Sequence, residues 1–378
     1  MATRDPGSAR APSIVIAAAG TGGHIYPGLA LADAISAARP AAAVQFVGTA
    51  KGMEGTLVPK AGHTLDLYDM VQFNGQGWRK ALVPAVLLRG SLQARGILRR
   101  HHADIAVSMG GYGGVPLVLG ARLAGVPAII HEPGAVPGQA NVFASRFTKN
   151  VATAFPQTRF AGRDVRYVGY PLRGSMTTFD RDARRGRARA ALGLDDRTAL
   201  VLVVGGSQGA LSLNLLTLGL AERWADRDDV RLLLKPGART HAQIAEQLAS
   251  NPGRHLVELV EYIDDMEDAY AAADIGICRA GAGTVTELAI VGLPSILVPL
   301  PAHEHDEQLH NAQSLVDAGG AIVVRDDDAT PDVVGPILEE RLADRSLLHA
   351  MSTNLQRAAR PRAAADLAAW VLEIAGAS

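Results

Sequence analysis

A short segment of small residues, followed by one carboxylate, comes directly after an apolar run in the C-terminal half of the chain. The segment reads Arg279-Ala-Gly-Ala-Gly-Thr284, and Glu287 follows it. Glycines allow a sharp turn, and a helix that begins there exposes N–H groups and the positive end of its dipole, for which phosphate is the natural ligand. A carboxylate about one turn into the helix can accept both hydrogen bonds of a ribose diol. Glu307, Gln308 and Asn311 would then meet sugar hydroxyls, so the pattern fits a nucleotide sugar.

Each of these features also has an ordinary structural explanation. A glycine turn before a helix is common in α/β proteins, and Glu287 alone would be a solvated helix residue. The combination of Arg279, Gly281, Thr284 and Glu287 with distal amides is rarer than its parts. The combination therefore favours a ligand site.

A histidine follows a second glycine loop near the N-terminus, in Gly20-Thr-Gly-Gly-His24. His24 could act as a general base or contact a phosphate, and the alternative is that it simply lines the loop. Two later segments, Gly110-Gly-Tyr-Gly-Gly114 and His131-Glu132, also follow apolar runs. Because the carboxyl ends of parallel strands meet at one edge of a sheet, we expect these residues to converge.

A further glycine loop, Gly205-Gly-Ser-Gln-Gly-Ala210, follows the apolar run 200–204 and precedes a helical pattern at 211–223. Ser207 and the loop amides would hold a phosphate. The same order of strand, glycine loop and helix occurs at 13–35. The chain is therefore predicted to contain two similar α/β halves facing each other. We expect strands at 13–19, 44–48, 105–109, 127–130, 200–204, 230–234, 256–260, 274–278, 295–300 and 321–324, and helices at 25–35, 116–123, 211–223, 284–291, 331–343 and 363–374.

Length and composition limit the function classes. A chain of 378 residues is long enough for two domains, and its net charge of −1 excludes a strong global field for nucleic acid. The single cysteine, Cys278, cannot form an internal disulfide, which fits a reducing compartment, and no Cys/His cluster has zinc spacing. We expect no cofactor. No signal-peptide core and no apolar run of about 18 residues is present.

The segment from Met70 to His102 contains no acidic residue, and six cations surround the apolar run 81–88. A basic rim around an apolar patch suits docking on anionic lipid headgroups. The alternative is an ordinary helix that packs on the core with solvated arginines. The cations are Arg79, Lys80, Arg89, Arg95, Arg99 and Arg100.

Two charged segments are assigned less specific roles. The run Asp180 to Arg189 is predicted to be part of a linker between the halves. Asp326 to Asp328 is interpreted as a solvated turn rather than a metal site, because three successive acids before a helix are typical of such turns.

These motifs, in this order, resemble the GT-B glycosyltransferases and most closely the MurG family, the N-acetylglucosaminyltransferases that make lipid II. The resemblance runs from Gly20-Thr-Gly-Gly-His24 to Asn311 and includes Tyr262-Ile-Asp-Asp-Met266. It implies two Rossmann-like domains facing a cleft: an acceptor domain at 1–172 and a UDP-sugar domain at 173–359. A C-terminal helix at about 360–378 would pack back on the first domain.

The resemblance also implies roles for individual residues. His24 and Glu132 would lie near the chemistry, and Ile263 would contact the uracil. The implied donor-binding residues are Ser207, Gln208, Gly209, Ile263, Arg279, Gly281, Ala282, Thr284, Glu287 and Gln308. The implied acceptor-binding residues are Thr21, Gly22, Gly23, Gly111, Tyr112, Gly113 and Asn141.

The reaction implied is metal-independent transfer of N-acetylglucosamine from UDP-GlcNAc to lipid I, with inversion, on the inner face of the cytoplasmic membrane. Family members carry H-E-Q-N where this chain has His131-Glu-Pro-Gly134, and G-N-P-[VL]-R where it has Gly169-Tyr-Pro-Leu-Arg173. These departures keep an alternative open, a related transferase acting from a UDP-sugar on a specialised acceptor such as a phosphoglycolipid. A non-catalytic protein that binds a sugar nucleotide or lipid carrier is the third possibility.

Overall fold

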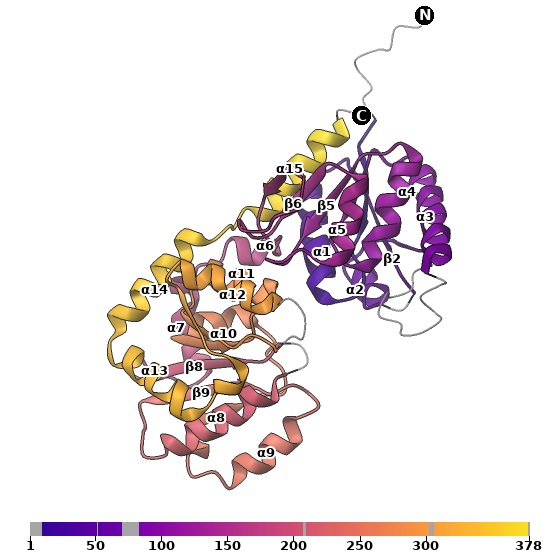
Figure 1. The fold of residues 1–378 in the computed structure, drawn as a ribbon. Helices are drawn as coiled ribbons and strands as arrows, with labels where there is room; N and C mark the ends of the chain where they lie inside the picture. Colours follow the sequence, from indigo (N-terminus) through magenta and orange to yellow (C-terminus); the bar gives the residue numbers. More distant parts are fainter. Residues whose placement is uncertain (1–9, 51, 70–82, 207–208, 302–305, 377–378) are drawn as a thin grey trace, which may run out of the picture. The chain divides into compact units, whose positions relative to one another are not determined.

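The computed structural model of the protein describes residues 10–50, 52–69, 83–206, 209–301 and 306–376. It divides into two compact units, which we call the first and second units. The first contains the residues up to Gly174 and those from Arg362 onward, and the second runs from Ser175 to Pro361. Each unit has its own parallel sheet with helices around it (Figure 1). The predicted class, two doubly wound α/β domains, is confirmed.

The sheet of the first unit has seven strands in the order β3-β2-β1-β4-β5-β6-β7, and every pairing is parallel. Its strands are β1 (Ser13–Ala17), β2 (Ala43–Gly48), β3 (Leu65–Leu67), β4 (Ile105–Ser108), β5 (Ala128–Glu132), β6 (Asn150–Thr153) and β7 (Val165–Tyr167). Its helices include α1 (Gly22–Ala38), α2 (Glu54–Lys60), α3 (Val83–Arg100), α4 (Val115–Ala124), α5 (Gln139–Ala144) and α15 (Ala363–Gly376).

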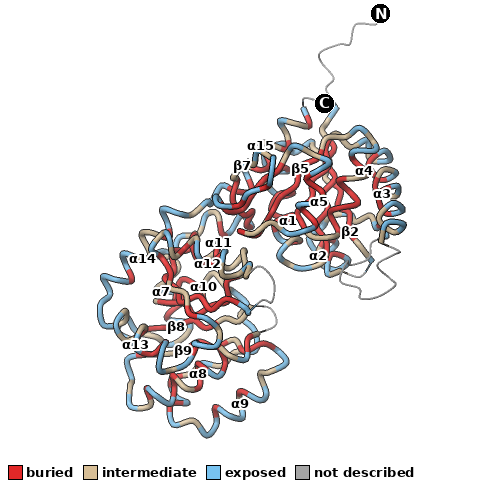
Figure 2. Tube along the Cα trace, in the orientation of Figure 1, coloured by how far each residue is buried: buried red, intermediate tan, exposed pale blue. Residues whose placement is uncertain are grey.

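Both faces of this sheet are buried, which explains why its strands are continuous apolar runs. Successive residues of β1 point to opposite faces, and Ile14 and Ile16 join a core cluster with α1 and α15. Val15 and Ala17 join a second cluster with α3, α4 and α5. Figure 2 shows the buried strands between more exposed helices.

The sheet of the second unit has six parallel strands in the order β10-β9-β8-β11-β12-β13. They are β8 (Ala199–Val204), β9 (Val230–Lys235), β10 (Val257–Leu259), β11 (Ile275–Cys278), β12 (Ser295–Leu297) and β13 (Ala321–Val323). Its helices are α7 (Arg181–Ala191), α8 (Leu211–Arg223), α9 (His241–Ala249), α10 (Met266–Ala272), α11 (Ala282–Val291), α12 (Glu307–Asp317), α13 (Pro331–Ala343) and α14 (Arg345–Ala358), with the short α6 (Gly174–Thr177) at the unit boundary.

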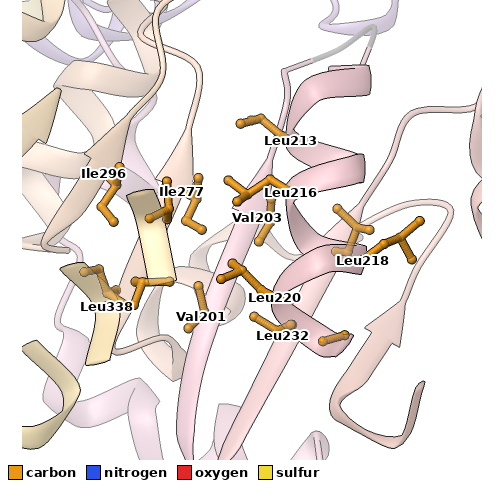
Figure 3. Packing of buried hydrophobic residues seen from close by; sticks show 14 of the residues in the cluster. Val201, Val203, Leu213, Leu216, Leu218, Leu220, Leu232, Ile277, Ile296 and Leu338 are labelled. Atoms are coloured by element: carbon orange, nitrogen blue, oxygen red, sulfur yellow. The ribbon is translucent and has the colours of Figure 1, made fainter. Parts of the chain in front are cut away.

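Helix α8 packs on one face of this second sheet. Val201 and Val203 of β8 lie in the same cluster as Leu213, Leu216 and Leu220 of α8, and all five are at most 1% exposed (Figure 3). Burying a side chain of this size contributes about 1.5–3 kcal/mol. This packing fixes α8, and so fixes where the loop between β8 and α8 begins and ends.

The charged run at 180–189 is a helix, so its interpretation as a linker was wrong. Helix α7 packs on α10 within the second unit. Arg185 and Arg189, one turn apart, bond the Asp274 carboxylate at 2.6 and 3.3 Å and also reach carbonyls at the end of α10. Cations at the negative end of a helix dipole are stabilising, so these arginines hold α7 to α10.

Within the described ranges, no helix is both long and apolar enough to cross a membrane.

Candidate active site

The carboxyl ends of β1, β4 and β5 lie at one edge of the first sheet, because these strands are adjacent and parallel. The loops after β1 and β4 turn sharply through Gly20, Gly110 and Gly111, whose φ angles of 98°, 96° and 73° favour glycine. The His24 imidazole lies against the second loop: a Cβ added to Gly110 or Gly111 would be 3.1 Å from a ring carbon. The structure therefore brings His24 and Gly111 together.

His24 is half-buried in the first turn of α1, with Nδ1 3.4 Å from the Thr21 hydroxyl. Burial lowers the pKa of His24, and the charge of Glu54 acts against that shift. The imidazole is consequently neutral at physiological pH, the form that accepts a proton.

Glu132, the other predicted catalytic residue, is 3% exposed at the end of β5. One carboxylate oxygen accepts a hydrogen bond from Gly134 N at 2.9 Å, and the other accepts from Gly138 N at 3.0 Å and Asn141 Nδ2 at 2.9 Å. These bonds order the loop that contains Pro133 and Gly134. The geometry therefore suits Glu132 to holding this loop and Asn141, and the role of general base stays a prediction for both His24 and Glu132.

His131 is fully buried beside this loop. Its Nε2 donates to Gly169 O at 3.0 Å, while Nδ1 has no hydrogen-bond partner. Burial lowers the pKa of His131 to about 4, so it is neutral. The ring of Tyr170 meets His131 edge to face at 6.4 Å, and its hydroxyl donates to Gly23 O at 2.9 Å. Tyr170, where the family pattern has asparagine, thus links β5 to the first glycine loop.

The remaining acceptor-side residues open two helices. Thr21 is the N-cap of α1, Gly22 and Gly23 begin it, and neither α1 nor α4 has a side-chain cap at its N-terminus. Tyr112 and Gly113 form a short 3-10 helix leading into α4, and the Gly113 carbonyl accepts a hydrogen bond from the Tyr68 hydroxyl. Helix N-termini of this kind can bind an anion through backbone N–H groups.

In the second unit, the loop between β8 and α8 approaches the loop after β9. Gly206 and Gly209 have φ angles of 83° and 75°, and a Cβ on Gly209 would be 2.0 Å from Pro236 O. The predicted phosphate residues Ser207 and Gln208 lie outside the described residues. Lys235 Nζ donates to Gly206 O at 3.4 Å, which places a cation beside this loop.

Helix α11 begins at the predicted second phosphate position. Gly281 is its N-cap with no side-chain cap, and Ala282 and Thr284, in the first turn, are partly exposed. The side-chain carbonyl of Gln308 accepts hydrogen bonds from Ala280 N at 3.1 Å and Leu300 N at 2.9 Å. Gln308 therefore lies at the mouth of this helix, with its amide NH2 as its remaining donor.

Glu287 lies farther along α11, where its Oε2 accepts a hydrogen bond from the Tyr270 hydroxyl at 2.8 Å. Tyr270 is 2% exposed, and burial raises the pKa of Glu287. Burial also raises the pKa of the neighbouring Cys278 thiol to about 12, so this cysteine is unreactive. Ile263, the predicted uracil contact, is partly exposed between β10 and α10.

Arg279 lies in the interior of the second unit. Its guanidinium bonds Asp326 Oδ1 at 2.5 Å, Ser212 Oγ at 3.0 Å and Val298 O at 3.1 Å. A direct contact of Arg279 with a ligand therefore stays a prediction, and its evident role is to tie β11, α8 and the turn after β13 together. The interpretation of Asp326 as part of a solvated turn was wrong, although Asp327 and Asp328 are exposed. The described residues contain no group of three or more metal-ligating side chains.

Three side chains that sequence reasoning missed support these sites: Glu54, Tyr170 and Tyr270. Tyr170 and Tyr270 carry no local signal, because their hydrogen-bond partners lie 147 and 17 residues away and belong to other elements. Glu54 is the first residue of α2, and a Cβ on Gly48 or Gly52 would collide with its side chain. Those two glycines were therefore a readable signal of a crowded carboxylate.

Two family models match most of this chain. Residues 14–153 match the N-terminal domain model of glycosyltransferase family 28, and residues 200–367 match its C-terminal domain model. The chain is 41% identical over 97% of its length to a Saccharopolyspora erythraea protein, covering 95% of that protein, and 41% identical over 99% to one from Paenarthrobacter aurescens, covering all of it. Both are named UDP-N-acetylglucosamine--N-acetylmuramyl-(pentapeptide) pyrophosphoryl-undecaprenol N-acetylglucosamine transferase.

Among solved structures, the crystal structure of Acinetobacter baumannii MurG is similar with a TM-score of 0.79 and 29% identity, over 96% of this chain and 99% of that one. Sequence, domain models and fold agree along nearly the whole chain. The chain therefore belongs to glycosyltransferase family 28, and within it to the MurG glycosyltransferases.

Proposed function

We propose that the protein transfers N-acetylglucosamine from UDP-GlcNAc to the MurNAc of lipid I, undecaprenyl-diphospho-MurNAc-pentapeptide, to give lipid II. The observation that carries this proposal is the 41% identity over 97% of the chain to a transferase of that name. The site geometry supports it, because the first unit offers a neutral histidine beside two uncapped helix starts and the second offers a glycine loop and a further uncapped helix.

On the donor side, the diphosphate would bind at Gly209 and at the start of α11, and the ribose would bind Glu287. The N–H groups and dipole at Gly281 to Thr284 stabilise the negative charge that develops on the leaving UDP. Gln308 would present its amide NH2 to a hydroxyl of the sugar, because its carbonyl is held by two backbone N–H groups.

On the acceptor side, the lipid diphosphate would bind the glycine loops that open α1 and α4. A MurNAc hydroxyl attacks the anomeric carbon as the bond from that carbon to the UDP oxygen breaks, which inverts the configuration. His24 takes the hydroxyl proton. Glu132 holds the loop at Pro133 and Gly134 beside it, and Asn141 with it.

The test is product analysis by mass spectrometry after incubation of the protein with UDP-GlcNAc and a short-chain lipid I analogue. UDP-glucose and UDP-galactose serve as matched donors, and a phosphoglycolipid serves as a matched acceptor. We expect one N-acetylhexosamine to be added to the lipid I analogue and UDP-GlcNAc to be preferred. A product formed only on the phosphoglycolipid would overturn the acceptor assignment and favour a specialised transferase.

We also propose that the first unit docks on an anionic membrane through α3. One face of α3 packs on the core through residues such as Ala94 and Leu98, whereas Leu88 and Leu92 are 59% and 50% exposed. Arg99 and Arg100 lie in the last turn of this helix, and two cations of the predicted rim form ion pairs, Arg100 with Asp66 at 3.2 Å and Arg89 with Asp69 at 2.8 Å. The predicted rim residues Arg79 and Lys80 lie outside the described residues.

Co-sedimentation with phosphatidylglycerol vesicles tests this docking. Leu88→Asp and Leu92→Asp should each reduce the bound fraction, and binding of the parent should weaken as salt is raised. Leu347→Asp is the matched control, because Leu347 is 36% exposed on α14 of the other unit. Equal binding of all variants would contradict the assignment of α3.

A further inference from the structure

A buried carboxylate lies directly beneath the first glycine loop. Glu54, at the start of α2, is 0% exposed. Its Oε2 accepts a hydrogen bond from Gly20 N at 2.9 Å, and its Oε1 accepts from Thr49 N and Thr49 Oγ1, each at 2.8 Å. Glu54 therefore connects the turn after β1, which leads to His24, with the end of β2.

The surrounding backbone leaves space for this carboxylate and little else. A Cβ on Gly48 would lie 2.6 Å from Glu54 Cγ, and one on Gly52 would lie 1.8 Å from Oε2. No arginine or lysine among the described residues forms an ion pair with Glu54. Burying a carboxylate is costly unless it is well hydrogen-bonded, and the three converging donors offset this cost in the absence of a paired cation in the described part of the chain.

The charge of Glu54 acts on His24. Two titratable groups face this imidazole from neighbouring elements: Glu54 on α2, whose negative charge raises the pKa of His24, and His131 on β5, which is neutral because burial lowers its pKa to about 4. A proton taken up by His24 therefore creates a half-buried cation with Glu54 as the nearby negative charge. A fixed carboxylate of this kind favours the imidazolium over the neutral ring.

We propose that Glu54 is a positioning residue of the transfer reaction: it holds the Gly20 loop, and its carboxylate stabilises the imidazolium that forms when His24 takes the proton of the acceptor hydroxyl. This role rests on the proposed function of His24 as the base. It extends the acceptor site to a side chain that contacts neither substrate.

The test is the pKa of His24, followed by NMR of the imidazole, together with steady-state kinetics of Glu54→Gln. The variant keeps the size of the side chain and removes its charge. We expect the pKa of His24 to fall below that of the parent, and kcat with the lipid I analogue to fall at least about tenfold, with UDP affinity unchanged. Thr49→Val is the matched control, because it removes one hydrogen bond to Glu54 and keeps the charge; the pKa of His24 should stay at the parent value.

Several results would overturn the proposal. One is an unchanged pKa of His24 in folded Glu54→Gln, which would show a purely structural residue. Another is a lowered pKa with unchanged kcat, which would separate Glu54 from the reaction. If the parent itself has no activity on lipid I, the proposed function fails while the pKa shift can still be measured.

A measurement on the parent needs no variant to fold. The Gly20 amide, as donor to Glu54, should exchange with solvent roughly 100-fold more slowly than an unstructured amide. An unprotected Gly20 amide would contradict the hydrogen bond on which the proposal depends.

Discussion

The hydrogen bond between Tyr270 and Glu287 leads to a prediction about ribose recognition. The Tyr270 hydroxyl donates a hydrogen bond to Oε2 of Glu287 at 2.8 Å. This bond fixes the orientation of the carboxylate and therefore also the direction of its other oxygen, Oε1. Tyr270→Phe removes the donor with little change in volume. A hydrogen bond to a charged group contributes about 1.5–3 kcal/mol, and about 1.4 kcal/mol corresponds to a tenfold change in affinity. We therefore expect UDP to bind Tyr270→Phe about tenfold or more weakly than it binds the parent.

Titration calorimetry with UDP and 2′-deoxy-UDP makes this prediction specific. The parent should prefer UDP, and both Tyr270→Phe and Glu287→Gln should reduce that preference, because each disturbs the carboxylate that we propose as the ribose contact. The double variant should be no worse than Glu287→Gln alone, since the hydroxyl acts through the carboxylate. A Tyr270→Phe protein that keeps the parent's affinity and preference, while Glu287→Gln loses both, would refute the reasoning.

Three further predictions follow from the first unit and the core. Gly110→Ala should lower the free energy of unfolding by about 2–6 kcal/mol, since a φ of 96° is strained for alanine and the added Cβ would meet His24. Denaturant unfolding measures this loss. Gly125→Ala is the control and should lose only the part due to strain, because its φ is 75° and its Cβ would meet no atom within 4 Å. The protein should lose about 3 kcal/mol of stability between pH 6.5 and pH 4, because His131 stays neutral in the folded state and is protonated in the unfolded state. His131→Gln should remove that part of the pH dependence of unfolding. Asp326→Asn should lower the melting temperature while Asp327→Asn leaves it unchanged, because only Asp326 pairs with the buried Arg279; equal melting temperatures would contradict this pairing.

Much of the fold was predictable because parallel sheets with both faces covered have continuous apolar strands. The runs at 13–19 and 200–204 and the glycine loops after them predicted β1, β8, α1 and α8. The run at 180–189 was misinterpreted because its charges suggested solvent, whereas its arginines end on carbonyls of α10, a partner about 80 residues farther along the chain.

The positions of the site residues followed from the same topology, but their states did not. The sequence predicted His24, Gly111 and Glu132 at one sheet edge. The structure shows that the Glu132 carboxylate already accepts hydrogen bonds from Gly134, Gly138 and Asn141. These partners lie only 2, 6 and 9 residues from Glu132, but the path of an irregular loop decides whether they meet it, and one sequence carries no direct signal of that path.

The most direct test of the central claim is UDP release by the purified protein with UDP-GlcNAc, with and without a short-chain lipid I analogue. We predict release that depends on the acceptor and that falls at least about 100-fold in His24→Ala, with UDP affinity unchanged, because the variant lacks the proposed base and keeps the donor site. No acceptor-dependent release from a protein that still binds UDP tightly, or equal release by His24→Ala, would contradict the account.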